Sequence, residues 1–334
     1  MLVTKPPQID PTEVPARGLG SFMLAARPGL YILLLLAVGV GVGARSFRKD
    51  SIFSCRASGY ASDRYIAYCG GKNYGDYEHG AFWFNLEPAA TAAAANSRVM
   101  FLGNSRMQFA FSSKATADWF SSLSESYYLL GFSAFGNYTF EAPLLRKLRP
   151  RAKVYVINID SFFDSAESPP AKIVMQDAAA QSRYEQKRQW QKIHKAICAS
   201  SEIVCGHGFA LFRSRSSGAW LMSGLQYKMD PVSVSYDEGV DQDMLASYTV
   251  RGNEFLPSLS ADRACTILTI VPTVKTTVGT AKAIAASLGL NLVAPTPAGL
   301  ITFDGSHLQP ESAQRWSAAF LEEAGPQIRK CLDQ

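Results

Sequence analysis

Three side chains that cooperate in nucleophilic catalysis occur at opposite ends of one stretch of this sequence. Ser105 follows an apolar run and a glycine, while Asp304 and His307 stand three residues apart far downstream. A serine hydroxyl is a weak nucleophile until a base takes its proton, and histidine suits that role near neutral pH. A carboxylate fixes the tautomer of the histidine and stabilises the imidazolium. We therefore predict a Ser–His–Asp triad of Ser105, His307 and Asp304.

The elements around these residues alternate between short apolar runs and helical patterns. We expect strands at 99–102, 127–130, 154–160, 265–271 and 291–293, and helices at 106–122, 140–148, 276–288 and 310–330. This alternation predicts an α/β fold with helices on both faces of a mostly parallel sheet. Catalytic groups gather at the carboxyl ends of such strands. Ser105 follows the first strand and the Asp304–His307 pair follows the last, so we expect them to converge.

Backbone donors for an oxyanion are expected at the same edge of the sheet. Ser105 lies at a strand-to-helix turn, where its own N–H and the start of the helix favour developing negative charge. Gly131 or Gly136, after the second strand, brings a second backbone N–H close because no side chain blocks the approach.

The quoted segments resemble a known family. VMFLGNSR and the downstream FDGSHL are similar to the first and last sequence blocks of SGNH (GDSL-type) hydrolases, and LLGFSAFGN and VYVINID occupy the places of the middle blocks. The resemblance implies a three-layer αβα sandwich with a flavodoxin-like sheet. It also implies that Ser105 is the nucleophile, His307 the general base and Asp304 its orienting carboxylate, with Gly131, or else Gly136, as the second-block glycine.

Two departures from the family pattern bear on the site. The sequence has Gly-Asn-Ser-Arg where the family has Gly-Asp-Ser, which resembles exported, membrane-anchored members linked to the acylation of surface polymers. Asn104 and Arg106 are then candidate substrate-binding residues, Arg106 holding an anionic or sugar group or else pairing with a surface carboxylate. The third-block asparagine, an oxyanion donor, has no direct match, and Asn158 or Asn137 stands nearest to it.

An uncharged apolar run, 30–44, lies near the start of the sequence. We divide the chain into a cytoplasmic tail (1–28), a membrane anchor or signal segment (29–45), an irregular lead-in (46–96) and an SGNH-like domain (97–334). That domain carries an insertion at about 165–262, which begins with a long polar helix at 178–199. A retained transmembrane anchor, a cleaved signal peptide ending near Ala44 and a buried core helix are the readings left open for the apolar run.

All six cysteines follow the apolar run. An even number placed in this way predicts export to an oxidising compartment, with Cys55–Cys69, Cys198–Cys205 and Cys265–Cys331 as the local pairings. Reduced core cysteines are the alternative. We predict no metal, because the sequence has no C-x-x-C pair and its four histidines are dispersed.

Composition and charge limit the kinds of partner and cofactor that we expect. A formal net charge of +5 over 334 residues, without a basic motif interleaved with aromatics, predicts no nucleic-acid binding. The sequence also lacks a G-x-G-x-x-G or G-K-[ST] loop, so we expect no nucleotide cofactor, and indeed no cofactor of any kind.

Three functions follow from these expectations. The first is an enzyme that moves an acyl group, acetyl by preference, on or off a cell-envelope saccharide, anchored at the periplasmic face of a bacterial inner membrane. The resemblance implies a membrane-bound O-acyltransferase as its donor partner. The second is a general lipase or esterase for small or lipid esters, and the third is a catalytically decayed scaffold of a polymer-modifying complex.

Overall fold

The computed structural model describes residues 28–70, 74–133, 136–198, 205–224 and 231–334. The chain divides into two compact units, residues 1–47 and 48–334. The expected cytoplasmic tail lies, apart from Pro28, outside the described residues.

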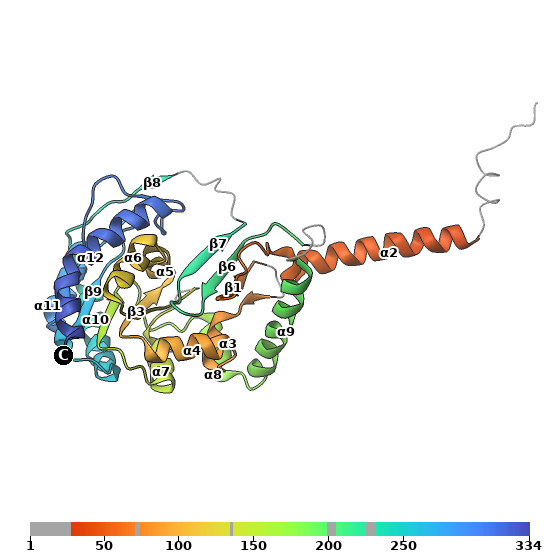
Figure 1. The fold of residues 1–334 in the computed structure, drawn as a ribbon. Coiled ribbons are helices and arrows are strands. Elements are labelled where there is room, and N and C mark those ends of the chain that lie inside the picture. The colour runs from red at the N-terminus through yellow and green to blue at the C-terminus, as the bar shows by residue number, and fades with distance from the viewer. Residues whose placement is uncertain (1–27, 71–73, 134–135, 199–204, 225–230) are drawn as a thin grey trace, which may run out of the picture. The chain divides into compact units, whose positions relative to one another are not determined.

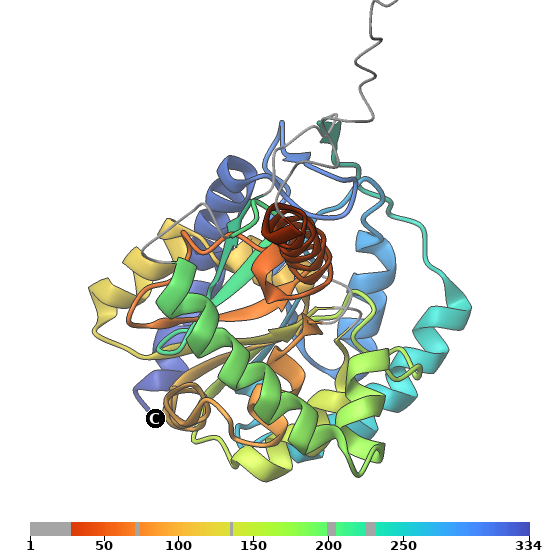
Figure 2. The same ribbon diagram turned by 90° about the vertical axis from the view of Figure 1, so that its right-hand side faces the viewer.

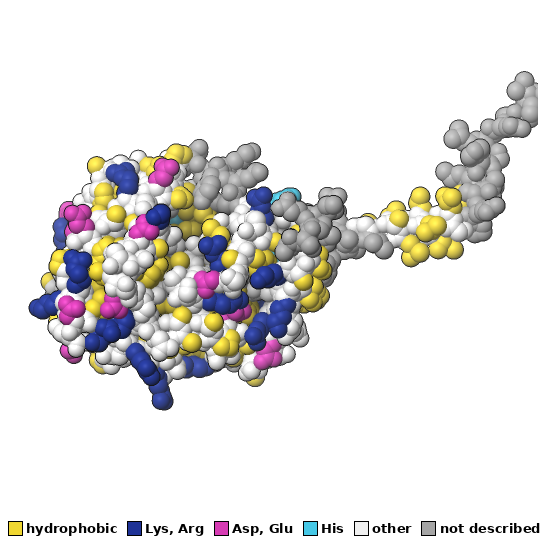
Figure 3. Space-filling model, viewed as in Figure 1, with side chains coloured by type: hydrophobic (Ala, Val, Ile, Leu, Met, Phe, Trp, Pro, Cys, Tyr) yellow, Lys and Arg dark blue, Asp and Glu magenta, His cyan; other side chains and the backbone are white. Residues whose placement is uncertain are grey.

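The apolar run forms helix α2, Pro28–Asp50, whose described side chains are hydrophobic and exposed (Figure 3). Within the described residues, no helix reaches the combination of length and apolar character needed to cross a bilayer.

A five-stranded parallel sheet forms the centre of the second unit. Its strands are β3 (Val99–Asn104), β4 (Tyr127–Phe132), β5 (Val154–Asn158), β9 (Thr266–Thr269) and β10 (Asn291–Leu292). Their order across the sheet is β10-β9-β5-β3-β4, and every neighbouring pair is parallel. Counted along the chain this is the order 2-1-3-4-5, one of the two common doubly wound arrangements. The prediction of an α/β fold on a parallel sheet is confirmed.

Helices cover both faces of this sheet (Figure 1). Successive residues of a strand point to opposite faces, so each strand contributes side chains to two hydrophobic cores. In β3, Val99 and Phe101 belong to one hydrophobic core, and Met100 and Leu102 belong to the other. The helices contributing to the first core are α5 (Ser105–Phe111), α6 (Lys114–Leu123) and α12 (Pro310–Leu332). Those contributing to the second include α4 (Pro88–Asn96), α7 (Tyr138–Leu148), α10 (Gln242–Phe255) and α11 (Val278–Leu288).

The helix expected at 106–122 is in fact two helices, α5 and α6. Ser113 ends the first run, because its extended backbone and its Oγ, which accepts from the N–H of Thr116 at 3.2 Å, form the N-cap of α6. Serine favours such caps over helix interiors, and the sequence pattern of apolar residues hid the break.

The expectation of an irregular lead-in at 46–96 was wrong. This segment contains a short 3₁₀ helix, two strands and two α-helices: η1 (Ile52–Ser54), β1 (Arg64–Cys69), β2 (Gly75–Asp76), α3 (Glu78–Trp83) and α4. β1 pairs antiparallel with β6 (Ala210–Ser214), which pairs with β7 (Trp220–Ser223), in a second sheet of order β2-β1-β6-β7. The periodicity was unrecognisable because β1 finds its partner inside the insertion, far along the chain.

The insertion is likewise more ordered than expected. It contains α8 (Pro169–Gln176), the predicted long helix α9 (Ala180–Cys198), and β8 (Val232–Ser233), which pairs with β11 (Ile301–Thr302). α9 lies against the second sheet (Figure 2). The Gln191 side chain bonds both the N–H and the carbonyl of Ile66 in β1, at 3.1 and 2.7 Å. The lead-in and the insertion therefore form one substructure.

All three predicted disulfides are present: Cys55–Cys69, Cys198–Cys205 and Cys265–Cys331. They are consistent with an oxidising, extracytoplasmic compartment. The first two staple the substructure made by the lead-in and α9. The third ties the start of β9 to the last turn of α12.

A buried arginine joins the two sheets. Arg213 of β6 is fully buried and donates to the carbonyls of Gly131, at 3.0 Å, and Leu129 on β4, the edge strand of the main sheet. Its guanidinium also pairs with the fully buried carboxylate of Glu78 at 2.9 Å. Trp220 Nε1 and the Ser133 N–H donate to the same carboxylate, at 3.2 and 2.8 Å. These carbonyls of the edge strand thus accept both from the second sheet and from Gln108 Nε2 of α5, at 2.9 and 2.8 Å.

We expect Arg213→Met to lower the free energy of unfolding by about 3–5 kcal/mol, because it leaves the Glu78 charge buried without its partner. The double variant Glu78→Gln/Arg213→Met should recover part of that loss, since no lone charge then remains. Urea unfolding followed by tryptophan fluorescence measures both. Equal stability of the single variant and the wild type would show that the pair is not the joint between the sheets.

Candidate active site

A tight loop after β11 carries the Asp304–His307 pair. Gly305 has φ of +80°, a left-handed conformation that favours glycine. The loop closes through the Phe303 N–H, which donates to the His307 carbonyl at 2.9 Å. Asp304 Oδ1 accepts from the backbone N–H groups of Ser306 and His307 at 2.9 and 2.8 Å. The sequence therefore folds locally so that both side chains leave one fixed turn.

The structure brings Asp304, His307 and Ser105 together in a hydrogen-bonded series. His307 Nδ1 lies 2.7 Å from Asp304 Oδ2, and His307 Nε2 lies 2.9 Å from Ser105 Oγ. An ionised carboxylate only accepts, so Nδ1 carries the proton and Nε2 is free to accept from the serine hydroxyl. This is the direction of proton transfer that activates a serine nucleophile.

The carboxylate of this series is held ionised. Partial burial raises the pKa of Asp304, but the hydrogen bond and charge of His307, together with the backbone donors, outweigh it and lower the pKa to about 2. Asp304 therefore stays charged in any assay above about pH 3, a full unit beyond its midpoint, and remains able to stabilise an imidazolium.

Ser105 is the first residue of α5, directly after β3. Gly103, the next-to-last residue of β3, has φ of +147° and is so closely packed that a Cβ there would lie 3.2 Å from the Cβ of Asn158. Asn104 is the N-cap: its Oδ1 accepts from the Arg106 N–H at 3.0 Å, and its Nδ2 donates to the Asp160 carbonyl at 2.9 Å. The side chain expected to bind substrate thus has both its amide atoms bonded within the protein.

Arg106 links the three chain segments of the site. Its Nε donates to Ser306 Oγ, inside the Asp304–His307 turn, at 2.8 Å, and its guanidinium pairs with the carboxylate of Asp160, which follows β5. Sequence reasoning gave no role to Ser306 or Asp160, although Asp160 was visible as a charged residue after a strand. The expectation that Arg106 binds substrate remains a prediction. What the structure shows is the alternative pairing with a carboxylate.

Two aromatic rings hold the imidazole in place. Phe303 stacks on His307 with ring centroids 5.5 Å apart, and Phe109, one turn after Ser105, meets it edge-on at 4.8 Å. Rings packed on two sides restrict rotation of the imidazole, so its Nε2 stays directed at the serine.

The predicted oxyanion donors lie at the carboxyl edge of the sheet, and they differ in burial and in their hydrogen-bond partners. Gly131 is buried in β4, where a Cβ would come within 2.7 Å of the Gly103 carbonyl oxygen. Asn158 is fully buried, its Oδ1 accepts from the backbone of Val271 at 3.0 Å, and its Nδ2 has no partner among the described residues. Asn137 instead caps α7. Of the two asparagines, only Asn158 keeps an unused donor.

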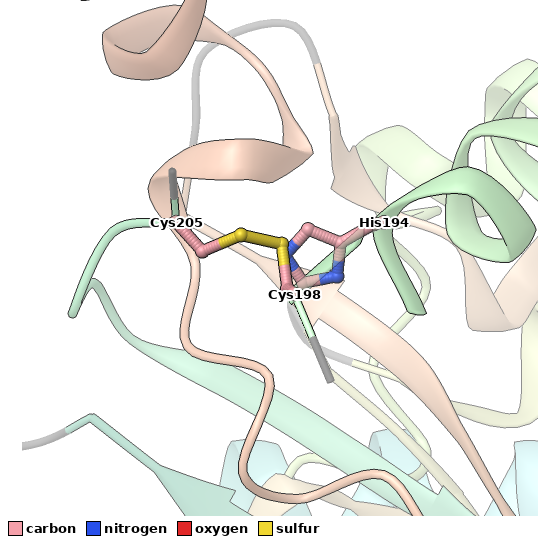
Figure 4. A group of neighbouring side chains, drawn as sticks. All are labelled: His194, Cys198 and Cys205. Atoms are coloured by element: carbon pink, nitrogen blue, oxygen red, sulfur yellow. A yellow bond between two sulfur atoms is a disulfide. The ribbon is translucent and has the colours of Figure 1, made fainter. Parts of the chain in front are cut away.

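Two groups of side chains come close enough for a metal, but bonds within the protein explain both. Cys198 and Cys205 beside His194 form a disulfide, so neither offers a thiolate (Figure 4). Both nitrogens of His194 are engaged, with the Tyr60 hydroxyl at 3.1 Å and the Cys55 carbonyl at 3.2 Å.

The second group, Asp76, Glu78 and His79, is also internally bonded. His79 Nδ1 lies 2.9 Å from Asp76 Oδ2, and Glu78 is the partner of Arg213. A cation there would face the guanidinium across a shared carboxylate.

Comparison of this chain with protein-family models, with curated proteins and with solved structures finds no match. What the site does must therefore be inferred from its own geometry and chemistry.

Replacing Asp304 by Asn should leave the fold intact but remove the acceptor that holds the proton on His307 Nδ1. We expect the rate at which a fluorophosphonate probe labels Ser105 to fall by about 10⁴-fold. Intact-protein mass spectrometry measures labelling over time. Labelling of the variant at the wild-type rate would exclude a role of the carboxylate on the imidazole.

Arg106→Met should misplace the Asp304–His307 turn, because the bond to Ser306 is lost. We expect kcat for ester hydrolysis to fall by about 10²-fold with little change in KM or thermal stability, as an error in alignment does. Arg106→Lys, which keeps the charge beside Asp160 but cannot bond both partners in the same geometry, should recover only part of kcat. A rise in KM at constant kcat would instead assign Arg106 to substrate binding.

Proposed function

We propose that this protein is an exported SGNH-type serine esterase or O-acyltransferase acting on acyl groups of a cell-envelope saccharide. The observation that carries the proposal is the series from Asp304 through His307 to Ser105, at 2.7 and 2.9 Å, at the carboxyl edge of a doubly wound sheet. Nothing in a structural core requires a serine hydroxyl, an imidazole and an ionised carboxylate in that order.

The reaction would proceed in two displacements. Ser105 Oγ attacks the ester carbonyl carbon while its proton passes to His307 Nε2, and Asp304 stabilises the resulting imidazolium. The tetrahedral intermediate collapses, the alcohol departs with the proton from Nε2, and the acyl group remains on Oγ. Water or a sugar hydroxyl then gives its proton to Nε2, attacks the acyl carbon and releases Ser105 with its proton restored.

The oxyanion formed in each step needs donors. The Ser105 N–H at the start of α5 and the unpaired Nδ2 of Asn158 are the candidates that the site offers, with Gly131 as a neighbouring backbone position. Each such donor contributes about 10²–10³ in rate where it has been removed from other hydrolases.

The SGNH assignment is supported by fold and position together. The strand order 2-1-3-4-5, with helices on both faces, is the flavodoxin-like αβα arrangement that the resemblance implies. The Gly-Asn-Ser-Arg segment lies at the end of β3 in that sheet, the Asp-Gly-Ser-His segment follows β11, and their side chains meet.

The proposed setting is the outer face of a membrane. Three disulfides support an oxidising compartment. Attachment through the apolar segment 29–45, at the periplasmic face of a bacterial inner membrane, and acyl supply by a membrane-bound O-acyltransferase are parts of the same proposal.

One observation favours a second candidate, a scaffold whose site no longer reacts. Asn158, the closest substitute for the third-block asparagine, has no exposed surface. A donor that stays sealed when substrate binds contributes nothing to catalysis.

Labelling with a fluorophosphonate separates the two candidates. The full chain should be labelled at one site, Ser105→Ala should abolish labelling, and Ser121→Ala, at an exposed serine of α6, should not affect it. An unlabelled wild type of native stability would favour the scaffold. Labelling that survives in Ser105→Ala would place the reactive residue elsewhere.

A further inference from the structure

A pocket of about 300 Å³ lies along the helix that begins with Ser105. Its lining includes Phe109, one turn after the serine, and Ser112 and Ser113 at the end of α5. With a rise of 1.5 Å per residue, Phe109 stands about 6 Å along the axis from Ser105. The pocket therefore starts close to the nucleophile and extends away from it.

The pocket shares two walls with the catalytic imidazole. Phe109 and Phe303, which pack on His307 at 4.8 and 5.5 Å, both line the pocket. The two phenylalanine rings thus contact the imidazole and also line the pocket.

The opposite wall comes from β7 of the second sheet. Trp220 meets Phe109 edge-on at 5.4 Å, and its indole N–H is fixed on the buried carboxylate of Glu78 at 3.2 Å. Leu221 and Met222 continue this wall. The substructure built from the lead-in and insertion thus supplies one side of the pocket, and α5, α12 and the segment after β11 supply most of the rest.

Eight of the twelve lining residues are apolar, and the polar ones make bonds within the protein. Ser112 Oγ already accepts from the backbone of β7 at 2.7 Å, Gln314 Oε1 from the backbone of α6 at 2.9 Å, and Ser113 caps α6. The ammonium of Lys114 is largely exposed and pairs with Asp118. A sugar ring needs partners for its hydroxyls, whereas a hydrocarbon chain needs only apolar surface.

We infer that this pocket seats the hydrocarbon chain of the acyl group that Ser105 transfers, so that the preferred acyl group is longer than acetyl. The inference rests on the proposed function. It also gives the second sheet a role in selecting the substrate.

The prediction concerns chain length. Each methylene buried adds about 0.8 kcal/mol, or roughly fourfold in kcat/KM. The full chain should therefore hydrolyse p-nitrophenyl octanoate at least tenfold more efficiently than the acetate, with the butyrate between them.

A charge at the pocket mouth should remove this preference. Leu221 is 36% exposed, so Leu221→Glu places a carboxylate against the chain without burying it. We expect the octanoate-to-acetate ratio of kcat/KM to fall by tenfold or more. Val250→Glu, at an exposed residue of α10 outside the pocket, is the matched control and should keep the wild-type ratio.

Binding without turnover separates this inference from the proposed function. Octanoate should bind to Ser105→Ala, measured by tryptophan fluorescence and calorimetry, and binding should be lost when Leu221→Glu is added. Active enzyme with equal kcat/KM for all three esters and no octanoate binding would overturn the pocket and leave the function standing. Failure of fluorophosphonate labelling with octanoate still bound would overturn the function and leave the pocket standing.

Discussion

The arrangement of this domain depends on one buried guanidinium. Arg213 reaches from the second sheet to the edge strand β4 and donates to the carbonyls of Leu129 and Gly131, which Gln108 also bonds. Its own charge is balanced by Glu78, from the lead-in, and Trp220 of β7 is fixed on the same carboxylate. One ion pair therefore sets the position of two sheets and of an aromatic wall. A buried pair of this kind adds little net stability, but removing either partner is costly, which makes it a specific connection.

Two parts of the domain hold the candidate site. The parallel sheet fixes Ser105 at the end of β3, and the turn after β11 fixes Asp304 and His307 opposite it. Between them Arg106 bonds Ser306 and pairs with Asp160, so three chain segments are tied by one side chain beside the nucleophile. The rings of Phe109 and Phe303 complete the support. Positions that in the sequence lie on separate segments thus behave as one rigid unit.

The features that the sequence predicted depend on residues close together in the chain, and most of those that it missed depend on contacts between residues far apart in the chain. The parallel strands carry their signal locally, since a run such as 154–157 is apolar throughout when both faces are buried. The same is true of the Asp304–His307 spacing and of the cysteines, whose pairings were guessed correctly. The second sheet was missed because β1 and β6 are short and are separated in the sequence by three strands of the main sheet, β3, β4 and β5. The roles of Asp160 and Ser306 were missed because a contact with Arg106 leaves no pattern in the sequence. The break between α5 and α6 was missed because two serines are only a weak signal of a helix end within a pattern of apolar residues.

Several of the elements that position Ser105, among them the helix held by the third disulfide, come late in the sequence. Cys331 joins the last turn of α12 to the start of β9, and α12 forms much of the core against which α5 packs. The turn with His307 immediately precedes that helix. Everything that positions Ser105 from this side therefore emerges from the ribosome long after the serine itself. A growing chain therefore holds Ser105 before His307 exists, and the hydrogen bond between the two side chains can form only after the segment with His307 has been made.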